Sequence, residues 1–129
     1  MRAAVRVAAV VAVVFGAVTV FAGGNVLFGS GAKAAGNYVP FVVWFNFFAG
    51  FAYVAAGVGL WNARPWATAF ALGLAVLTAL VFAAFGVYAG SGGAYEPRTV
   101  AAMAVRTALW TFIAALAWLA GRSIEQRAT

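Results

Sequence analysis

The stretch from Phe41 to Trp61 constrains the fold more than any other part of the chain, because it is apolar and contains no charged side chain. As a helix, such a run is long enough to cross the roughly 30 Å hydrocarbon layer of a bilayer. Within it, small or polar residues recur at steps of four, three and four, which places them on one helical face. These residues are Asn46, Gly50, Tyr53 and Gly57. The pattern predicts a membrane-spanning helix whose small, polar face turns toward other helices.

Three further apolar runs have similar lengths, so the sequence predicts four spans. Their expected bounds are residues 7–28, 38–61, 65–89 and 99–120, with Gly121 ending the last helix and a short polar tail after it. Short connections between helices make neighbouring helices antiparallel. The 129 residues include 8 Lys and Arg and 2 Asp and Glu, far below the roughly one quarter that soluble domains carry. We therefore expect an all-α, four-helix transmembrane bundle, up-down-up-down, forming a single integral membrane domain.

The first run has an alternative interpretation. A basic start, an apolar core and the small residues 22–24 also describe a secretory signal. We favour a retained helix, since the apolar run continues to Phe28, beyond the usual length of a signal core. Small side chains share one face of this run, as expected where helices pack closely in lipid. They are Ala12, Gly16, Thr19 and Gly23.

Basic residues near the span ends predict the orientation of the chain. Those expected on the side of the termini are Arg2, Arg6, Arg64, Arg122 and Arg127, and those expected on the other side are Lys33 and Arg98. This asymmetry predicts cytoplasmic termini, with loops 29–37 and 90–97 outside. The net charge of +6 then indicates contact with anionic lipid headgroups, and nucleic acid is not an expected partner.

Arg106 is the strongest candidate for a ligand-binding residue, because it lies about eight residues, or roughly 12 Å, inside the fourth span. An arginine in hydrocarbon costs about 2.5 kcal/mol or more, so its guanidinium should face the bundle interior and find partners. Asn46 is expected at the same depth in the second span. The remaining candidates are Thr19 at about the same depth, Tyr53 a further two turns inward, Trp110 one turn after Arg106, and Glu96 in the outer loop.

Together these residues predict an outward-opening, positive pocket that suits an anion, a quinone headgroup or a lipid headgroup, with Glu96 folding over its mouth. The alternative is that Arg106 snorkels outward or pairs with Glu96 only to fix helix packing. Asn46 is better explained by an interhelical hydrogen bond without a ligand, and Tyr53 has two interpretations, an interior hydroxyl or a space-filling ring. Gly50 and Gly57 are interpreted as packing glycines.

Catalytic groups are scarce, since the chain has no cysteine and no histidine, and its two acids, Glu96 and Glu125, are far apart. Metal coordination by thiolate or imidazole and a Ser-His-Asp triad are thereby excluded. We expect a non-catalytic membrane subunit or a small-ligand binder. The alternatives are a homo-oligomeric channel or transporter for a small anion and, third, an enzyme that uses a quinone. Expected partners are the lipid bilayer, further copies of the chain or other membrane subunits.

The glycines of the second span and the turn Leu60-Trp61-Asn62-Ala63-Arg64-Pro65-Trp66-Ala67, followed by an alanine-rich third span, resemble the DoxX-like small membrane proteins of bacteria. The resemblance covers roughly residues 38 to 90. It implies a bacterial inner membrane location and, for some relatives, a place in quinone-linked oxidoreductase assemblies. DoxX-like proteins often carry an acid in the second span, where this chain has Asn46.

Overall fold

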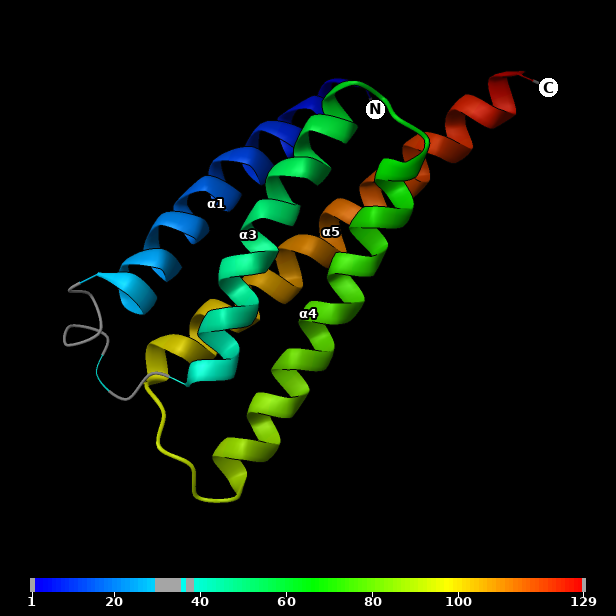
Figure 1. The fold of residues 1–129 in the computed structure, drawn as a ribbon. Helices are drawn as coiled ribbons and strands as arrows, with labels where there is room; N and C mark the ends of the chain where they lie inside the picture. Colours follow the sequence, from blue (N-terminus) through cyan, green and yellow to red (C-terminus); the bar gives the residue numbers. More distant parts are fainter. Residues whose placement is uncertain (1, 30–35, 37–38, 129) are drawn as a thin grey trace.

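The computed structural model describes residues 2–29, 36 and 39–128. These residues form four long helices, α1 (Arg2–Phe28), α3 (Pro40–Trp61), α4 (Trp66–Gly90) and α5 (Pro97–Ala128). The described part of the chain contains no β-strand. The helices pack side by side, so the expected all-α, four-helix bundle is confirmed (Figure 1).

The ribbon in Figure 1 shows successive helices running in opposite directions, with both termini at the same end of the bundle. A tight turn reverses the chain after α3. In it, the Arg64 N–H donates to the Gly59 carbonyl at 2.9 Å, and the Ala63 N–H donates to the Leu60 carbonyl at 3.2 Å. This pair of bonds is the Schellman motif, which satisfies the last carbonyls of a helix. Ala63 adopts the left-handed conformation that the motif requires, with φ of 54°, where glycine is usual.

The end of α4 has the same motif with the expected residue. Gly92 has φ of 93°, and the Gly93 N–H donates to the Tyr88 carbonyl at 3.0 Å. The Tyr88 hydroxyl also donates to the Ala94 carbonyl at 3.0 Å, so this outer connection is held against the end of α4.

The bounds of the helices correct one expectation. Gly121 does not end the last helix, because α5 continues to Ala128. One glycine inside a helix costs only about 1 kcal/mol relative to alanine, and the following segment contains Arg, Glu and Gln, which favour helix. The other bounds differ by a few residues: α1 begins at Arg2, α3 at Pro40, α4 at Trp66 and α5 at Pro97. The expected start at residue 38 lies outside the described residues, as does most of the loop expected at 29–37.

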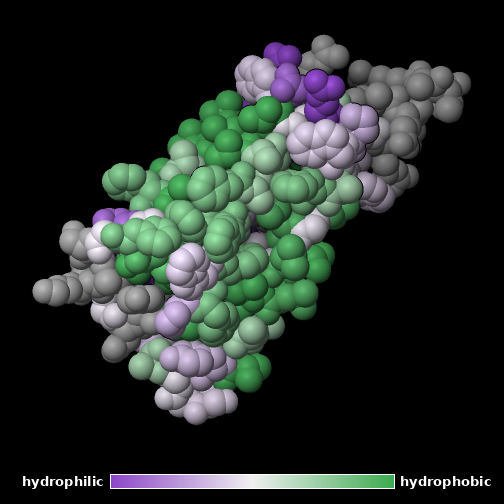
Figure 2. Space-filling view, in the orientation of Figure 1, coloured by the Kyte–Doolittle hydropathy of each residue, from purple (hydrophilic) through white to green (hydrophobic). Residues whose placement is uncertain are grey.

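Each helix contains an apolar segment long enough to cross a membrane, namely Ala3–Phe28, Pro40–Trp61, Trp66–Gly90 and Pro97–Gly121. A soluble helix turns its apolar stripe inward and its polar face outward. Here large apolar side chains face outward on every helix, among them Val18, Phe48, Leu80 and Phe112. In Figure 2, hydrophobic residues cover most of the middle of the visible face, and hydrophilic residues gather toward its ends. The chain is a small multi-pass membrane protein.

Glycines allow α1 and α3 to pack against each other over most of their length. A Cβ at Gly16 would lie 2.6 Å from the carbonyl oxygen of Gly50. A Cβ at Gly57 would lie 2.7 Å from the carbonyl oxygen of Ala9. Both distances are too short for a real side chain, so Gly50 and Gly57 are packing glycines as predicted. The predicted small face of the first span is also confirmed, since Ala12, Gly16, Thr19 and Gly23 are all buried.

The interior between α3, α4 and α5 is filled by two large aromatic side chains surrounded by alanines. Tyr53 and Trp110 are fully buried there, and their ring centroids are 4.8 Å apart. The same packed group includes the alanines Ala67, Ala71, Ala75, Ala114 and Ala117. A second, smaller group of Val39, Val42, Phe85 and Met103 fills the bundle near the start of α3 and α5. The first group holds the polar side chains described next.

Candidate functional site

Four polar side chains from three helices meet inside the bundle and are called here the interior polar cluster. They are Tyr53 of α3, Thr78 of α4, and Arg106 and Trp110 of α5. Tyr53, Thr78 and Trp110 have no exposed surface at all, and Arg106 is half-buried. The Tyr53 hydroxyl lies within interaction range of both the Thr78 hydroxyl and the Arg106 guanidinium. The cluster therefore joins α3, α4 and α5 at one level of the membrane.

Arg106 points into the bundle and not toward lipid. It shares a face of α5 with Met103, Trp110 and Ile113, all of which are buried, as the helical spacing of three, four and seven residues requires. Its guanidinium lies 5.3 Å from the ring centroid of Phe15, on α1, which is a cation–π contact. An inward arginine is expected, because lipid offers neither water nor acceptors.

Tyr53 and Arg106 meet in the cluster although they lie at different distances from the starts of their helices. Tyr53 lies thirteen residues after the start of α3, or about 20 Å, and Arg106 lies nine residues after the start of α5, or about 14 Å. Both helices begin at the same end of the bundle (Figure 1). The Tyr53 phenol and the Arg106 guanidinium nevertheless lie within interaction range of each other.

Hydrogen bonding in this region is incomplete. The buried atoms without a partner are Asn46 Oδ1, Tyr53 Oη, Thr78 Oγ1, Arg106 Nε and Trp110 Nε1. Leaving a buried donor or acceptor unsatisfied costs about 1–3 kcal/mol, and native proteins rarely leave such groups without a protein or water partner. Four of these five atoms belong to the interior polar cluster. The cluster therefore carries four buried polar atoms whose hydrogen bonds are not made.

The hydroxyl of Thr107, on α5, is hydrogen-bonded within its own helix. Its Oγ1 donates to the Met103 carbonyl, one turn earlier, at 2.8 Å, a bond open to any helical threonine. Thr78 has no such bond. The difference marks Thr78 as the hydroxyl left open to another partner.

Asn46 and Thr19 occupy less central positions than the sequence predicted for them. Asn46 is half-buried, and its Oδ1 accepts no hydrogen bond, so the bond expected from Arg106 to this oxygen is not formed. Thr19 is buried, with 3% of its surface exposed, on the face of α1 that meets α3. It lies one turn after Phe15, so α1 contributes both residues to the same side of the bundle.

Glu96 lies in the connection between α4 and α5, close to the connection between α1 and α3. Its carboxylate packs against Gly36, where an added Cβ would clash with it. The preceding Tyr95 stacks edge-on against Phe85, with ring centroids 5.6 Å apart. About 15 Å of helical rise separates Glu96 from Arg106, whose guanidinium contacts Tyr53 and Phe15.

Trp110, a candidate from the sequence, belongs to the interior polar cluster. In the structure the indole packs against the phenol ring of Tyr53 at an interplanar angle of 32°, and the guanidinium contacts Phe15. Two residues of this region, Thr78 and Phe15, were not among the sequence candidates. Thr78 had a signal, as a lone polar side chain at the middle of α4, whereas nothing distinguished Phe15 from the other phenylalanines.

No family model, no curated protein and no solved structure matches this chain. Its function therefore has to be argued from the chemistry of the interior polar cluster and from the membrane setting of the bundle.

Proposed function

We propose that the protein is a non-catalytic membrane subunit or small-ligand binder, and that its interior polar cluster receives a hydrogen-bond-accepting group of the ligand. The observation that carries the proposal is the set of unpartnered polar atoms on Tyr53, Thr78, Arg106 and Trp110. Each unmade bond costs the fold about 1–3 kcal/mol, so a ligand group that completes these bonds would stabilise the bundle.

The chemistry of the unpartnered atoms favours an acceptor. Arg106 Nε and Trp110 Nε1 can only donate, whereas the hydroxyls of Tyr53 and Thr78 can donate or accept. Four possible donors thus converge from three helices. A quinone carbonyl, an oxygen of a lipid headgroup or a small anion would match them. A quinone as the ligand also agrees with the resemblance to DoxX-like proteins.

The available residues support binding more than catalysis. The sequence supplies no histidine or cysteine, and Glu96, the acid nearest the cluster in sequence, lies at the bundle mouth about 15 Å of helical rise away from Arg106. General acid–base catalysis needs a titratable group within hydrogen-bond reach of the reacting atom. A redox partner subunit would have to supply any chemistry performed on a bound ligand.

We further propose that the helix ends carrying Glu96 face the outside of a bacterial inner membrane. The excess of basic residues near the termini supports this orientation. A ligand entering from that side would pass the connection that packs against Gly36 and Phe85 before reaching Arg106.

The test begins with what copurifies with the intact protein in mild detergent or nanodiscs, identified by mass spectrometry. Arg106→Leu should then remove binding of that compound while preserving membrane insertion, because the substitution makes the span more apolar. The matched control is Arg64→Leu, in the exposed turn after α3, which leaves the basic residues still biased toward the termini. Glu96→Gln should weaken binding less, since a charge at the mouth is screened. Equal loss in the Arg64 and Arg106 variants would contradict the proposal.

The alternative function is a homo-oligomeric channel or transporter for a small anion. The inward guanidinium of Arg106 favours it, because a positive group lining a membrane passage selects anions. Flux of chloride or phosphate into liposomes containing the purified protein, lost in Arg106→Leu and kept in Arg64→Leu, would support the alternative over a retained ligand.

A further inference from the structure

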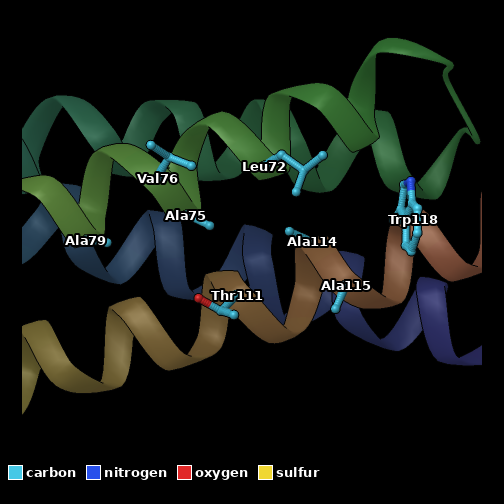
Figure 3. A pocket seen from close by; sticks show the side chains of 8 residues that line it. All are labelled: Leu72, Ala75, Val76, Ala79, Thr111, Ala114, Ala115 and Trp118. Atoms are coloured by element: carbon cyan, nitrogen blue, oxygen red, sulfur yellow. The ribbon is translucent and has the colours of Figure 1, made fainter.

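A lateral groove follows the seam between α4 and α5 (Figure 3). Its volume is about 390 Å³. Small side chains line most of it, Ala75 and Ala79 from α4 and Ala114 and Ala115 from α5, with Trp118 at one end. The polar side-chain atoms among the sticks in Figure 3 are the Thr111 hydroxyl and the Trp118 indole nitrogen. The groove is therefore an apolar slot within the membrane-spanning part of both helices.

The floor of this groove is also the wall of the interior polar cluster. Ala75 and Ala114 are 9% and 2% exposed and belong to the same packed group as Tyr53 and Trp110. Thr78 follows Ala75 by about one turn of α4, and Trp110 precedes Ala114 by about one turn of α5. At each of these two positions, the side chain between the groove and the cluster is therefore only a methyl group.

The groove faces hydrocarbon, which restricts what can fill it. Val76 and Leu72, on its rim, are 58% and 43% exposed on the outside of the bundle, where a membrane supplies lipid chains and no water. Its volume corresponds to roughly thirteen groups of about 30 Å³, the share of a water molecule in the liquid. A segment of hydrocarbon chain fits such a slot.

The depth of the cluster restricts the head of such a ligand. Thr78 lies midway along α4, about 18 Å from the helix end at Trp66 and equally far from the end at Gly90. A phosphate-bearing headgroup would have to leave the interface and carry its charge to the middle of the hydrocarbon, which is costly. A neutral head with carbonyl oxygens avoids that cost and still offers acceptors to the donors of the cluster.

We propose that the α4–α5 groove holds the single hydrocarbon chain of a neutral, carbonyl-headed lipid, whose head is bound by the interior polar cluster. The inference rests on the proposed function and names the class of ligand and its route. The head enters sideways between α4 and α5, past Ala75 and Ala114, and the chain remains in the groove. Thr111, which lines the groove beside Trp110 in sequence, offers the first hydroxyl on this route.

A second groove, between α1 and α3, does not have this relation to the cluster. It has a volume of about 330 Å³ and is lined by residues that include Val10, Val14 and Trp61. Its floor is formed where Gly57 meets the backbone of Ala9, a contact between two backbones that leaves no way inward. This groove is the control site for binding of the hydrocarbon chain.

The experiment uses the full chain in nanodiscs and two probes, a quinone with a long isoprenoid chain and the same quinone without a chain. Ala79→Phe and Ala115→Phe fill the groove from exposed rim positions, and Ala84→Phe adds the same ring to an exposed position elsewhere on α4. Affinity is read from the shift of the melting midpoint with probe concentration. We expect the two groove variants to bind the long-chain quinone about tenfold more weakly or worse, as overpacking a filled site does.

The binding of the two quinones to each variant tests whether the groove holds the hydrocarbon chain. Unchanged binding of the chainless quinone in both groove variants, with Ala84→Phe like the wild type for both probes, supports the groove as the chain site. Undiminished binding of the long-chain quinone in the groove variants overturns the groove and leaves the proposed function standing. Equal weakening of both probes also overturns it, since the substitutions would then act on the head site. If the wild type binds neither quinone, the ligand class is wrong, and the proposed function is judged by its own copurification and anion tests.

A second measurement does not depend on the variants. A long-chain quinone carrying a photoreactive group in its chain should crosslink to peptides containing residues 72–79 or 111–118. Crosslinking confined to residues 9–14 or 57–62, at the groove between α1 and α3, would refute the assignment.

Discussion

Thr78→Val is the most informative single substitution, because it should make the ligand-free protein more stable while weakening its site. Thr78 has no exposed surface, and its hydroxyl has no partner. Valine has nearly the same shape without the hydroxyl, so packing against the neighbouring helices is kept. The native state then loses an unsatisfied polar group and gains no cavity.

The magnitude follows from the environment of the hydroxyl. A buried group without a hydrogen bond costs about 1–3 kcal/mol. In the unfolded state within detergent or lipid, the same hydroxyl can bond to a carbonyl of its own helix. We take the lower end of the range because relaxation of the native helix can recover part of such a bond, and expect Thr78→Val to raise the free energy of unfolding by about 1 kcal/mol.

Thr107→Val is the matched control, since it removes a hydroxyl of the same kind that is bonded. Its Oγ1 donates to the Met103 carbonyl at 2.8 Å, so the substitution should be neutral or cost up to about 1 kcal/mol. Both variants can be compared by unfolding with increasing fractions of denaturing detergent, followed by the helical circular dichroism signal. The opposite signs of the two effects are the expected result.

The reasoning fails if Thr78→Val destabilises the ligand-free protein as much as Thr107→Val does. That outcome would mean that the Thr78 hydroxyl is bonded in the native state. With a bound ligand the order should reverse, because a ligand at a hundred times its Kd adds about 2.7 kcal/mol to the wild type and less to a variant that binds it weakly. A stabilising effect that persists unchanged in saturating ligand would show that Thr78 takes no part in the site.

Four other predictions follow from the fold. Ala63→Gly should raise the free energy of unfolding by about 0.5–1 kcal/mol, since Ala63 holds a left-handed conformation, and an unchanged or lower stability in detergent unfolding would contradict this. Gly57→Leu should separate α1 from α3 and lower the melting midpoint. Gly73→Leu should not lower it, because a Cβ at Gly73 has nothing within 4 Å. Equal effects of the two substitutions would mean that the close approach of α1 to α3 is unimportant for stability. A reporter fused after Thr129 should show cytoplasmic activity, and one active only in the periplasm would reverse the predicted orientation. The mature protein should retain α1, because α1 covers Gly50 and Gly57, and an intact mass matching cleavage near Ala22 would exclude it.

The number and approximate bounds of the spans could be predicted from the sequence. The thickness of the hydrocarbon layer sets a minimum length of apolar helix, and that length can be counted along the chain without knowledge of the partners. The packing face of the first span was equally predictable, since small residues at helical spacing have one main use in lipid. The inward direction of Arg106 followed from the cost of exposing its charge to hydrocarbon.

Local signals were less reliable where several weak preferences compete. Gly121 was expected to end the last helix, and α5 continues past it because one glycine costs less than the helix gains from the residues on either side. Ala63 occupies a position where a glycine is usual, so no residue type in the sequence indicated the turn geometry there. The short distance between the adjoining spans imposes that turn.

The tertiary structure alone decided which side chains meet. Counting residues from the span ends placed Asn46 level with Arg106 and Tyr53 deeper, but depth along a helix does not specify the direction of a side chain or the tilt of its neighbour. The phenol of Tyr53 lies within interaction range of Arg106, and Phe15 from α1 completes that contact. Thr78 joins them because α4 packs its middle turn against Trp110 and Tyr53, a relation set by how three helices share one core and not by any single segment of the chain.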